Sequence, residues 1–147
     1  MSFSCKTPTE FSKEALAEIM ISTQGKEVNL QTILQQHKGK KIVIDVWATW
    51  CRDCIEGLPK VAALQDEFPE VVFLFLSEDR TQEVWKKGID KYQIKGEHYF
   101  IKTGAKGDFK DFLNSNWIPR YMIINEAGDI VLFKAETASD ERIKTLL

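Results

Sequence analysis

The stretch WATWCRDC, residues 47–54, contains Cys51 and Cys54 with two residues between them. It overlaps the end of the run KIVIDVWA, residues 41–48, whose nearly unbroken apolar character is typical of a central strand covered on both faces. The next segment, residues 54–68, carries apolar side chains at helical spacing and contains a proline, which predicts a kinked helix. The cysteines are therefore predicted to lie where a buried strand meets the start of a helix.

This position suits the pair to redox chemistry. Unpaired N–H groups at the start of a helix, together with the helix dipole, stabilise a thiolate, which is the nucleophile of thiol–disulfide exchange. We expect Cys51 to attack a disulfide of a partner. Cys54, one turn further into the helix, would be more buried and would resolve the mixed disulfide. Trp50 would shield the pair and offer an apolar contact surface.

Two other uses of a cysteine pair fit the chain less well. A zinc site usually takes four ligands, whereas His37 and His98 lie far apart in the sequence and the third cysteine, Cys5, stands alone. A bridge between cysteines three residues apart closes a very small loop and adds little stability through chain entropy. We therefore expect no metal and no cofactor besides a redox-active disulfide, and we interpret Cys5 as an incidental thiol.

Composition narrows the function classes further. The chain has 147 residues, 44% hydrophobic and 29% charged, with a formal net charge of -2. These values suit one globular domain over residues 1–147 and provide no basic face for nucleic acid. No run approaches the ~18 apolar residues of a membrane span. The first residues, MSFSCKTPTEF, lack the basic and apolar regions of a secretory signal. The compartment is therefore not indicated by a targeting sequence in this chain.

The remaining pattern alternates strands and helices. We expect residues 1–18 to be a loosely ordered lead-in, followed by a hairpin that turns at residues 24–26 and a short helix around residues 30–34. Further along, the pattern predicts strands at 71–77 and 97–101, helices at 81–94, 107–116 and 139–147, and a hairpin across 120–135. This order indicates an α/β domain with a central mixed sheet flanked by helices.

The segment DVWATWCRDC, residues 45–54, resembles the active-site segment of the thioredoxin superfamily. Asp45 falls where those proteins carry a buried acid in the central strand, and Trp50 falls on a matching tryptophan. The second landmark of that family is a cis-proline that faces the disulfide. Pro119 in NWIPRYMIIN matches it, with Ile118 at the peptide-contacting position just before. The resemblance therefore implies a cis bond at Pro119.

Features around these landmarks are similar to the TlpA/ResA-type branch of the superfamily. They are the lead-in GKEVNLQTILQQHKGKK, the Leu58–Pro59 pair, and the helix and strand that separate the cysteines from Pro119. The resemblance implies a thioredoxin-like fold with an N-terminal hairpin and a helix–strand insertion before the cis-proline strand. It also implies an extracytoplasmic setting, periplasmic or in the cell envelope, with any membrane tether outside residues 1–147.

The function implied by this resemblance is a thiol–disulfide oxidoreductase. It would act as a monomer, reduce disulfides of other proteins and be recharged by an upstream thiol electron donor. Asp45 would accept a proton from Cys54 during resolution, and Ile118 with Pro119 would orient the substrate chain through backbone contacts. Two alternatives stay open at this point. The couple could oxidise its partners rather than reduce them, or the chain could be a non-catalytic binding module on the same fold.

Some positions depart from the branch or are interpreted as structural. Gly57 stands where some members carry a buried Glu, and Arg52 and Asp53 between the cysteines have opposing effects on a thiolate. We interpret Arg120 as a solvated side chain rather than a contact to a partner backbone, and Trp117 as a core residue, with a place at the border of the partner groove as the alternative. Peroxidase activity is not expected, because the proline and the threonine of a peroxiredoxin motif are absent before Cys51. Copper delivery is not expected either, because copper-delivery proteins of related fold use a wider cysteine spacing and a distal histidine.

Overall fold

The computed structural model describes residues 6–147, so Cys5 lies outside the described part of the chain. Its centre is a seven-stranded sheet in the order β2-β1-β5-β4-β3-β6-β7. Strands β3 (Ile42–Trp47), β4 (Val72–Ser77) and β5 (Glu97–Ile101) are parallel to one another. Strand β6 (Arg120–Ile124) runs antiparallel to β3, and β7 (Ile130–Ala135) runs antiparallel to β6. The sheet is therefore mixed, as the order of elements predicts.

The predicted N-terminal hairpin is present at the other edge of the sheet. Strand β1 (Ile19–Ser22) pairs antiparallel with β2 (Glu27–Asn29) and, on its other side, with β5. The sheet order thus places the hairpin next to β5, the strand of the predicted helix–strand insertion. Insertion and hairpin extend the sheet on the side away from β6.

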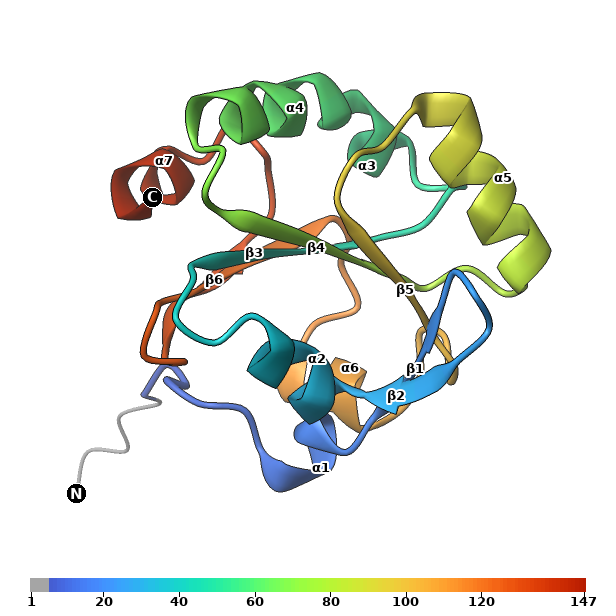
Figure 1. Cartoon of the computed structure of the whole chain (residues 1–147), viewed down its shortest axis with the longest axis horizontal. Coiled ribbons are helices and arrows are strands. Elements are labelled where there is room, and N and C mark those ends of the chain that lie inside the picture. The colour runs from blue at the N-terminus through green and yellow to red at the C-terminus, as the bar shows by residue number, and fades with distance from the viewer. Residues whose placement is uncertain (1–5) are drawn as a thin grey trace.

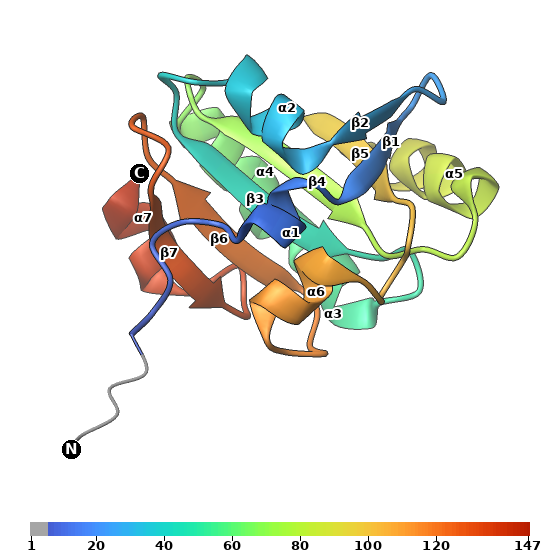
Figure 2. The same ribbon diagram turned by 90° about the horizontal axis from the view of Figure 1, so that it is seen from below.

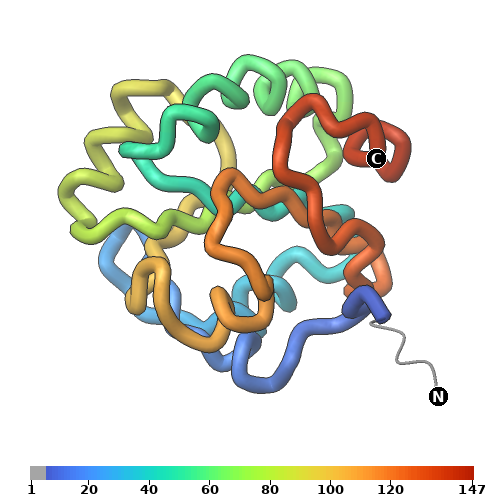
Figure 3. Tube along the Cα trace, turned by 180° about the vertical axis from the view of Figure 1, so that it is seen from behind, coloured from blue at the N-terminus to red at the C-terminus, as the bar shows by residue number. Residues whose placement is uncertain are grey.

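Helices cover both faces of the sheet. One face is covered by α3 (Arg52–Glu56), α4 (Leu58–Glu67), α5 (Gln82–Tyr92) and α7 (Glu141–Leu146) (Figure 1). Figure 2 shows the other face, with α1 (Lys13–Leu16), α2 (Leu30–Gln36) and α6 (Asp108–Leu113). Figure 3 shows α7 beside α4, and an ion pair of 3.2 Å between Lys144 Nζ and Glu67 Oε2 joins the two helices. None of the helices in the described part of the chain is long and apolar enough to cross a membrane.

Strand β3 lies at the centre of this arrangement. All six of its residues are buried, because β4 and β6 flank it in the sheet and helices cover both of its faces. The unbroken apolar run that predicted a central strand is explained by this double cover. Since both neighbours pair with β3 up to its last residues, the backbone that leads into the cysteines is fixed on both sides.

The helix predicted after the cysteines is divided into two. Helix α3 ends at Glu56, Gly57 follows as its C-cap, and α4 begins at Leu58 with Pro59 in its first turn. Proline is tolerated there because the first N–H groups of a helix have no partner within the helix. The predicted kink at this point is confirmed as a break between two helices.

Part of the expected loose lead-in is packed instead. Within the described residues, Ser12 caps α1 by accepting a hydrogen bond from the N–H of Ala15 at 3.1 Å. Phe11 is 9% exposed, and its ring centroid lies 5.2 Å from that of Phe112 on α6. The aromatic contact offsets the entropy lost on ordering this segment, so Phe11 and α1 pack against the rest of the fold.

Arg120 is also placed differently from the prediction. It is 1% exposed rather than solvated, because its position on β6 directs the side chain to the face that α6 covers. Its guanidinium donates hydrogen bonds to the carbonyl of Leu113 at 3.0 Å and to that of Phe133 at 2.9 and 3.1 Å. It also lies 4.7 Å from the centre of the Phe133 ring. Arg120 thus joins α6 and β7 next to the segment that carries Pro119.

A buried ion pair links α6 to the end of β4. Lys110 Nζ lies 2.6 Å from Glu78 Oε2, and the two side chains are 6% and 3% exposed. Burial raises the pKa of Glu78, while the hydrogen bond and charge of Lys110 lower it. The ammonium group of Lys110 and the carboxylate of Glu78 therefore each offset the cost of burying the other's charge.

We predict that Lys110→Met lowers the free energy of unfolding by about 3–5 kcal/mol, because it leaves the Glu78 carboxylate buried without a cation. Urea unfolding at neutral pH measures this change. The double variant Glu78→Leu/Lys110→Met should recover most of the loss, and Lys106→Met, an exposed control, should change little. Equal effects of Lys110→Met and Lys106→Met would contradict the assignment.

Candidate active site

The two cysteines lie at the joint between β3 and α3, as predicted. Cys51 is the N-cap residue of α3, with extended backbone angles, and its Sγ accepts a hydrogen bond from the N–H of Cys54 at 3.1 Å. A sulfur in this position accepts hydrogen bonds from the free N–H groups of the first helical turn and lies at the positive end of the helix dipole. The local geometry therefore favours a thiolate on Cys51 when the pair is reduced.

Cys51 and Cys54 form a disulfide, with their Cα atoms 5.2 Å apart. Cys51 is 6% exposed and Cys54 is 2% exposed. An incoming thiolate must reach a sulfur along its S–S axis, so the more accessible Cys51 is the point of attack. The order of exposure agrees with the prediction of an outer nucleophile and an inner resolving cysteine.

The segment before β6 lies against this disulfide. The Ile118–Pro119 peptide bond is cis, and the carbonyl oxygen of Ile118 lies 3.7 Å from Cys51 Sγ. Both Ile118 and Pro119 are buried. The sequence segments 47–54 and 116–119 are thus brought to one end of the sheet, where β3 ends and β6 begins.

Two exposed indoles belong to the same end of the molecule. Trp50, directly before the first cysteine, is 66% exposed, and Trp117, directly before Ile118, is 52% exposed. The interpretation of Trp117 as a core residue is wrong, because it belongs to the loop between α6 and β6 and lines a surface groove with Pro119. Large exposed aromatic side chains next to a reactive group are typical of an interaction surface.

Asp45 is the acid predicted inside the central strand, and the structure buries it to 2% exposure. Its Oδ1 atom makes no hydrogen bond to any described residue. Burial raises the pKa of Asp45 to about 8. The carboxyl group therefore changes protonation close to neutral pH, in the range where an acid–base group is most effective.

Asp79 holds the loop that precedes the cysteines, and sequence reasoning missed it. Its Oδ1 accepts hydrogen bonds from the N–H of Thr49 at 3.0 Å and from the Thr49 hydroxyl at 2.7 Å. Its Oδ2 accepts a hydrogen bond from the Ser77 hydroxyl at 2.7 Å. Gly88 on α5 packs against the same threonine, since a Cβ there would overlap the Thr49 methyl group. The sequence did offer a sign of this role, because the polar residues 77–79, Ser-Glu-Asp, follow directly on the apolar run of the neighbouring strand β4.

Three positions that depart from the pattern of the TlpA/ResA-type branch lie on or next to α3. Arg52 and Asp53 are exposed, and Arg52 Nε pairs with Glu56 Oε1 at 2.9 Å on the outer side of α3. Gly57 lies over the sheet, where a Cβ would come within 3.0 Å of the Tyr121 hydroxyl. A side chain as large as Glu therefore does not fit at position 57 without displacing Tyr121.

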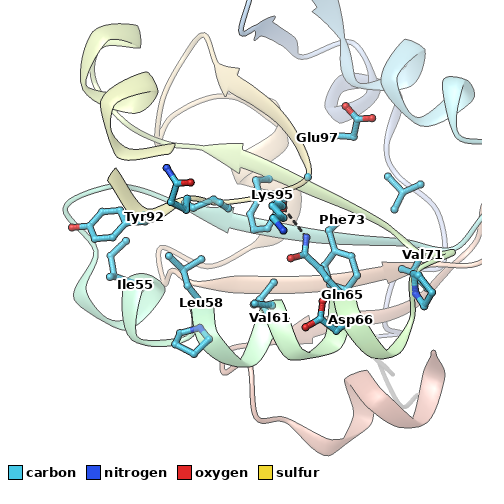
Figure 4. A pocket seen from close by; sticks show the side chains of 18 residues that line it. Ile55, Leu58, Val61, Gln65, Asp66, Val71, Phe73, Tyr92, Lys95 and Glu97 are labelled. Carbon is cyan, nitrogen blue, oxygen red and sulfur yellow. Dashed lines mark hydrogen bonds between the residues drawn. The ribbon is translucent and has the colours of Figure 1, made fainter. Parts of the chain in front are cut away.

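A separate cavity of about 900 Å³ lies between α4, β4 and the end of α5. Figure 4 shows its lining, with Leu58 and Val61 from α4 facing Phe73, and a hydrogen bond of 2.6 Å from Gln65 Nε2 to the carbonyl of Lys95. Neither cysteine belongs to the lining. The cavity is therefore not the place where disulfide exchange occurs.

Comparison with known proteins agrees with the fold and the site. A sequence model of the thioredoxin-like family matches residues 39–130. The thioredoxin-like protein YneN of Bacillus subtilis is 28% identical over 82% of this chain and 74% of its own length. The thiol-disulfide oxidoreductase ResA of Bacillus cereus is 28% identical over 88% of this chain and 72% of its own. Three further ResA sequences, from Bacillus cereus, Bacillus thuringiensis and Bacillus anthracis, are matched over 53% of their length.

A solved structure extends this likeness to three dimensions. The crystal structure of a protein described as a thiol-disulfide oxidoreductase from Bacteroides vulgatus superposes with a TM-score of 0.75 and 30% identity. The likeness covers 97% of this chain and 96% of the other. A disulfide between the cysteines of a Cys-X-X-Cys motif at the start of a helix defines the class, a thiol–disulfide oxidoreductase. The chain belongs to the thioredoxin-like family.

The raised pKa of Asp45 predicts a pH dependence of stability. The unfolded chain releases this proton near pH 4, and the native state near pH 8. Between these values the native state binds more protons, so the free energy of unfolding falls as pH rises, by at most about 1.4 kcal/mol per pH unit. Urea unfolding of oxidised Asp45→Asn between pH 5 and 8.5 should show a flatter slope than wild type. An unchanged slope, as expected of the exposed control Asp129→Asn, would rule out this pKa.

A second prediction concerns Asp79. Asp79→Ala removes the acceptor for Thr49 and Ser77, so it should lower the free energy of unfolding by about 2–4 kcal/mol. It should also shift the reduction potential of the disulfide, because the loop that positions Cys51 is released. Urea unfolding and redox equilibration measure the two effects, with the exposed Asp66→Ala as the control. A potential that stays at the wild-type value would show that the network is only structural.

Proposed function

We propose that this oxidoreductase reduces disulfides of other proteins in an extracytoplasmic compartment and is recharged by an upstream thiol electron donor. The observation that carries the proposal is the disulfide of Cys51 and Cys54, with Cys51 capping α3 and the Ile118 carbonyl 3.7 Å from its sulfur. The compartment and the direction rest on the resemblance to the TlpA/ResA-type branch. A monomer as the active unit rests on the same resemblance.

The first step begins from the reduced dithiol. The Cys51 thiolate attacks one sulfur of the substrate disulfide, an S–S bond forms between enzyme and substrate, and the other substrate sulfur leaves as a thiolate that takes a proton. The free N–H groups at the start of α3 stabilise the attacking thiolate. The Ile118 carbonyl and the cis-proline segment offer backbone groups to the extended substrate chain on either side of its cysteine.

The second step releases the substrate. The thiol of Cys54 gives its proton to the Asp45 carboxylate, and the resulting thiolate attacks Cys51 Sγ. The Cys51–Cys54 bond forms and the mixed disulfide breaks. The second substrate sulfur leaves with the electron pair of the broken bond, and it takes up a proton while Asp45 releases the one it received. Two electrons pass to the substrate in total. The upstream donor then returns two electrons and two protons to the pair by the reverse exchange.

The surface around the disulfide suits a protein substrate rather than a small molecule. Trp50 and Trp117 expose apolar rings on the segments that flank the pair, and Pro119 lines the groove next to Trp117. Flat aromatic surfaces of this kind contact varied apolar side chains and do not require one sequence. We therefore propose that Trp50, Ile118 and Pro119 bind the substrate, with Trp117 added to this set.

We predict that Cys54→Ser traps a mixed disulfide between Cys51 and a protein substrate, whereas Cys51→Ser traps none and loses turnover. Both variants are made in a Cys5→Ser background, which removes the third thiol and is itself expected to retain turnover. Non-reducing gels of the reduced variants mixed with native, disulfide-bonded insulin or a disulfide-bonded reporter protein measure trapping, and insulin reduction measures turnover. Turnover by Cys51→Ser, or the absence of any trapped species with Cys54→Ser, would contradict the mechanism.

A further inference from the structure

Asp45 and Tyr121 face each other across two neighbouring strands. They are register partners in the antiparallel pairing of β3 with β6. Residues directly opposite one another in such a pair direct their side chains to the same face, with Cβ atoms about 4.5–5.5 Å apart. The Tyr121 hydroxyl lies close to Gly57, so both side chains point to the face that α3 and α4 cover.

Both side chains end in a polar group that is buried and unpaired. Asp45 is 2% exposed and Tyr121 is 1% exposed. Asp45 Oδ1 and Tyr121 Oη make no hydrogen bond to any described residue. A buried polar group without a partner costs about 1–3 kcal/mol, so two of them side by side indicate a polar function at this place.

A surface groove lies next to Gly57, the residue close to the Tyr121 hydroxyl. Its lining includes Gly57 and Ala138, and its volume is about 390 Å³, enough for several water molecules. A Cβ at position 57 would lie 3.0 Å from Tyr121 Oη and 3.3 Å from the Ala138 Cβ. The Tyr121 hydroxyl does not itself line the groove but lies close to Gly57, which does.

We propose that Tyr121 is a positioning residue for the resolving step: its hydroxyl donates a hydrogen bond to a buried water between the two unpaired groups, and this water donates one to the Asp45 carboxylate that accepts the proton of Cys54. This inference rests on the proposed role of Asp45 in that step. The S–H bond of Cys54 breaks and an O–H bond forms on Asp45, while Tyr121 keeps its own proton. Burial and the charge of Asp45 both raise the pKa of Tyr121, so it stays a donor throughout the cycle.

Several titratable groups share this region and must be separated in a test. Tyr121 is the register partner of Asp45 on β6, and the partner of Asp45 on β4 is the apolar Phe75. Cys54 belongs to α3, which covers the same face of the sheet. The groove adds charged side chains from α3, α4 and the segment after β7, namely Asp53, Glu56, Lys60 and Glu136. An Asp45→Asn background removes the titration of Asp45 and leaves all of these in place.

The experiment is a double-mutant cycle on the pH profile of disulfide exchange. Reduced wild type, Tyr121→Phe, Asp45→Asn and the double variant are mixed with excess oxidised glutathione between pH 5 and 10. Tryptophan fluorescence in a stopped-flow instrument follows formation of the Cys51–Cys54 disulfide. Tyr121→Phe keeps the ring and removes an unpaired buried hydroxyl, so it is expected to fold with wild-type stability or better.

Tyr121→Phe should raise the midpoint assigned to Asp45 by about one pH unit, because one hydrogen bond to the charged form is lost. At neutral pH the resolving step should be about tenfold slower than in wild type. In the Asp45→Asn background the same substitution should change neither the rate nor the profile. Tyr99→Phe, a partly buried tyrosine on β5, is the matched control and should behave as wild type.

Two results would overturn the proposal. A midpoint in Tyr121→Phe equal to that of wild type and Tyr99→Phe would show that the hydroxyl does not act on Asp45. An equal slowing by Tyr121→Phe with and without Asp45 would show a purely structural effect. If wild type itself forms no Cys51–Cys54 disulfide with oxidised glutathione, the proposed function fails, and that result is distinct from both.

Discussion

The cap that Cys51 places on helix α3 is the interaction on which the rest of the site depends. It brings a sulfur to the free N–H groups of the first turn, and a thiolate is stable only while that geometry holds. The fold secures it from three directions. Strand β3 is held by a neighbour on each side, Asp79 holds Thr49 before the turn, and the Ile118 carbonyl lies against the sulfur from the opposite segment. Arg120 lies on β6, the strand after this segment, and its hydrogen bonds hold β6 against α6 and β7.

Burial of β3 serves structure and chemistry together. The cover that makes it a stable central strand also removes water from Asp45, and the pKa of this acid rises to about 8 as a result. An acid with an ordinary pKa would remain ionised at neutral pH and would be a weak base toward a thiol. The pKa of Asp45 lies close to that of an ordinary thiol, about 8.5, which brings proton transfer between the two kinds of group nearer to balance. The loss of stability at high pH is the physical consequence of that adjustment.

The sequence predicted those parts of the site that follow from local pattern. Cys51, Cys54 and Asp45 lie within ten residues of one another, where a buried strand and a helix start are both legible, and Pro119 was found through the family resemblance. Positions that depend on register between distant strands were not found. The contact of Tyr121 with Gly57 is one case, and the burial of Arg120 is another, since an arginine in a short strand gives no sign of which carbonyls it will meet. Trp117 was misplaced because composition alone favours burial of a tryptophan.

The reduction potential of the Cys51–Cys54 couple tests the central claim most directly. Equilibration of the protein against graded dithiothreitol or glutathione buffers, followed by tryptophan fluorescence, gives this value. A reductant of protein disulfides should have a potential near that of thioredoxin, about −270 mV. A potential near that of DsbA, about −120 mV, would contradict the proposed direction and make the protein an oxidant. The absence of any reversible couple would contradict the redox function itself and leave a binding module on this fold.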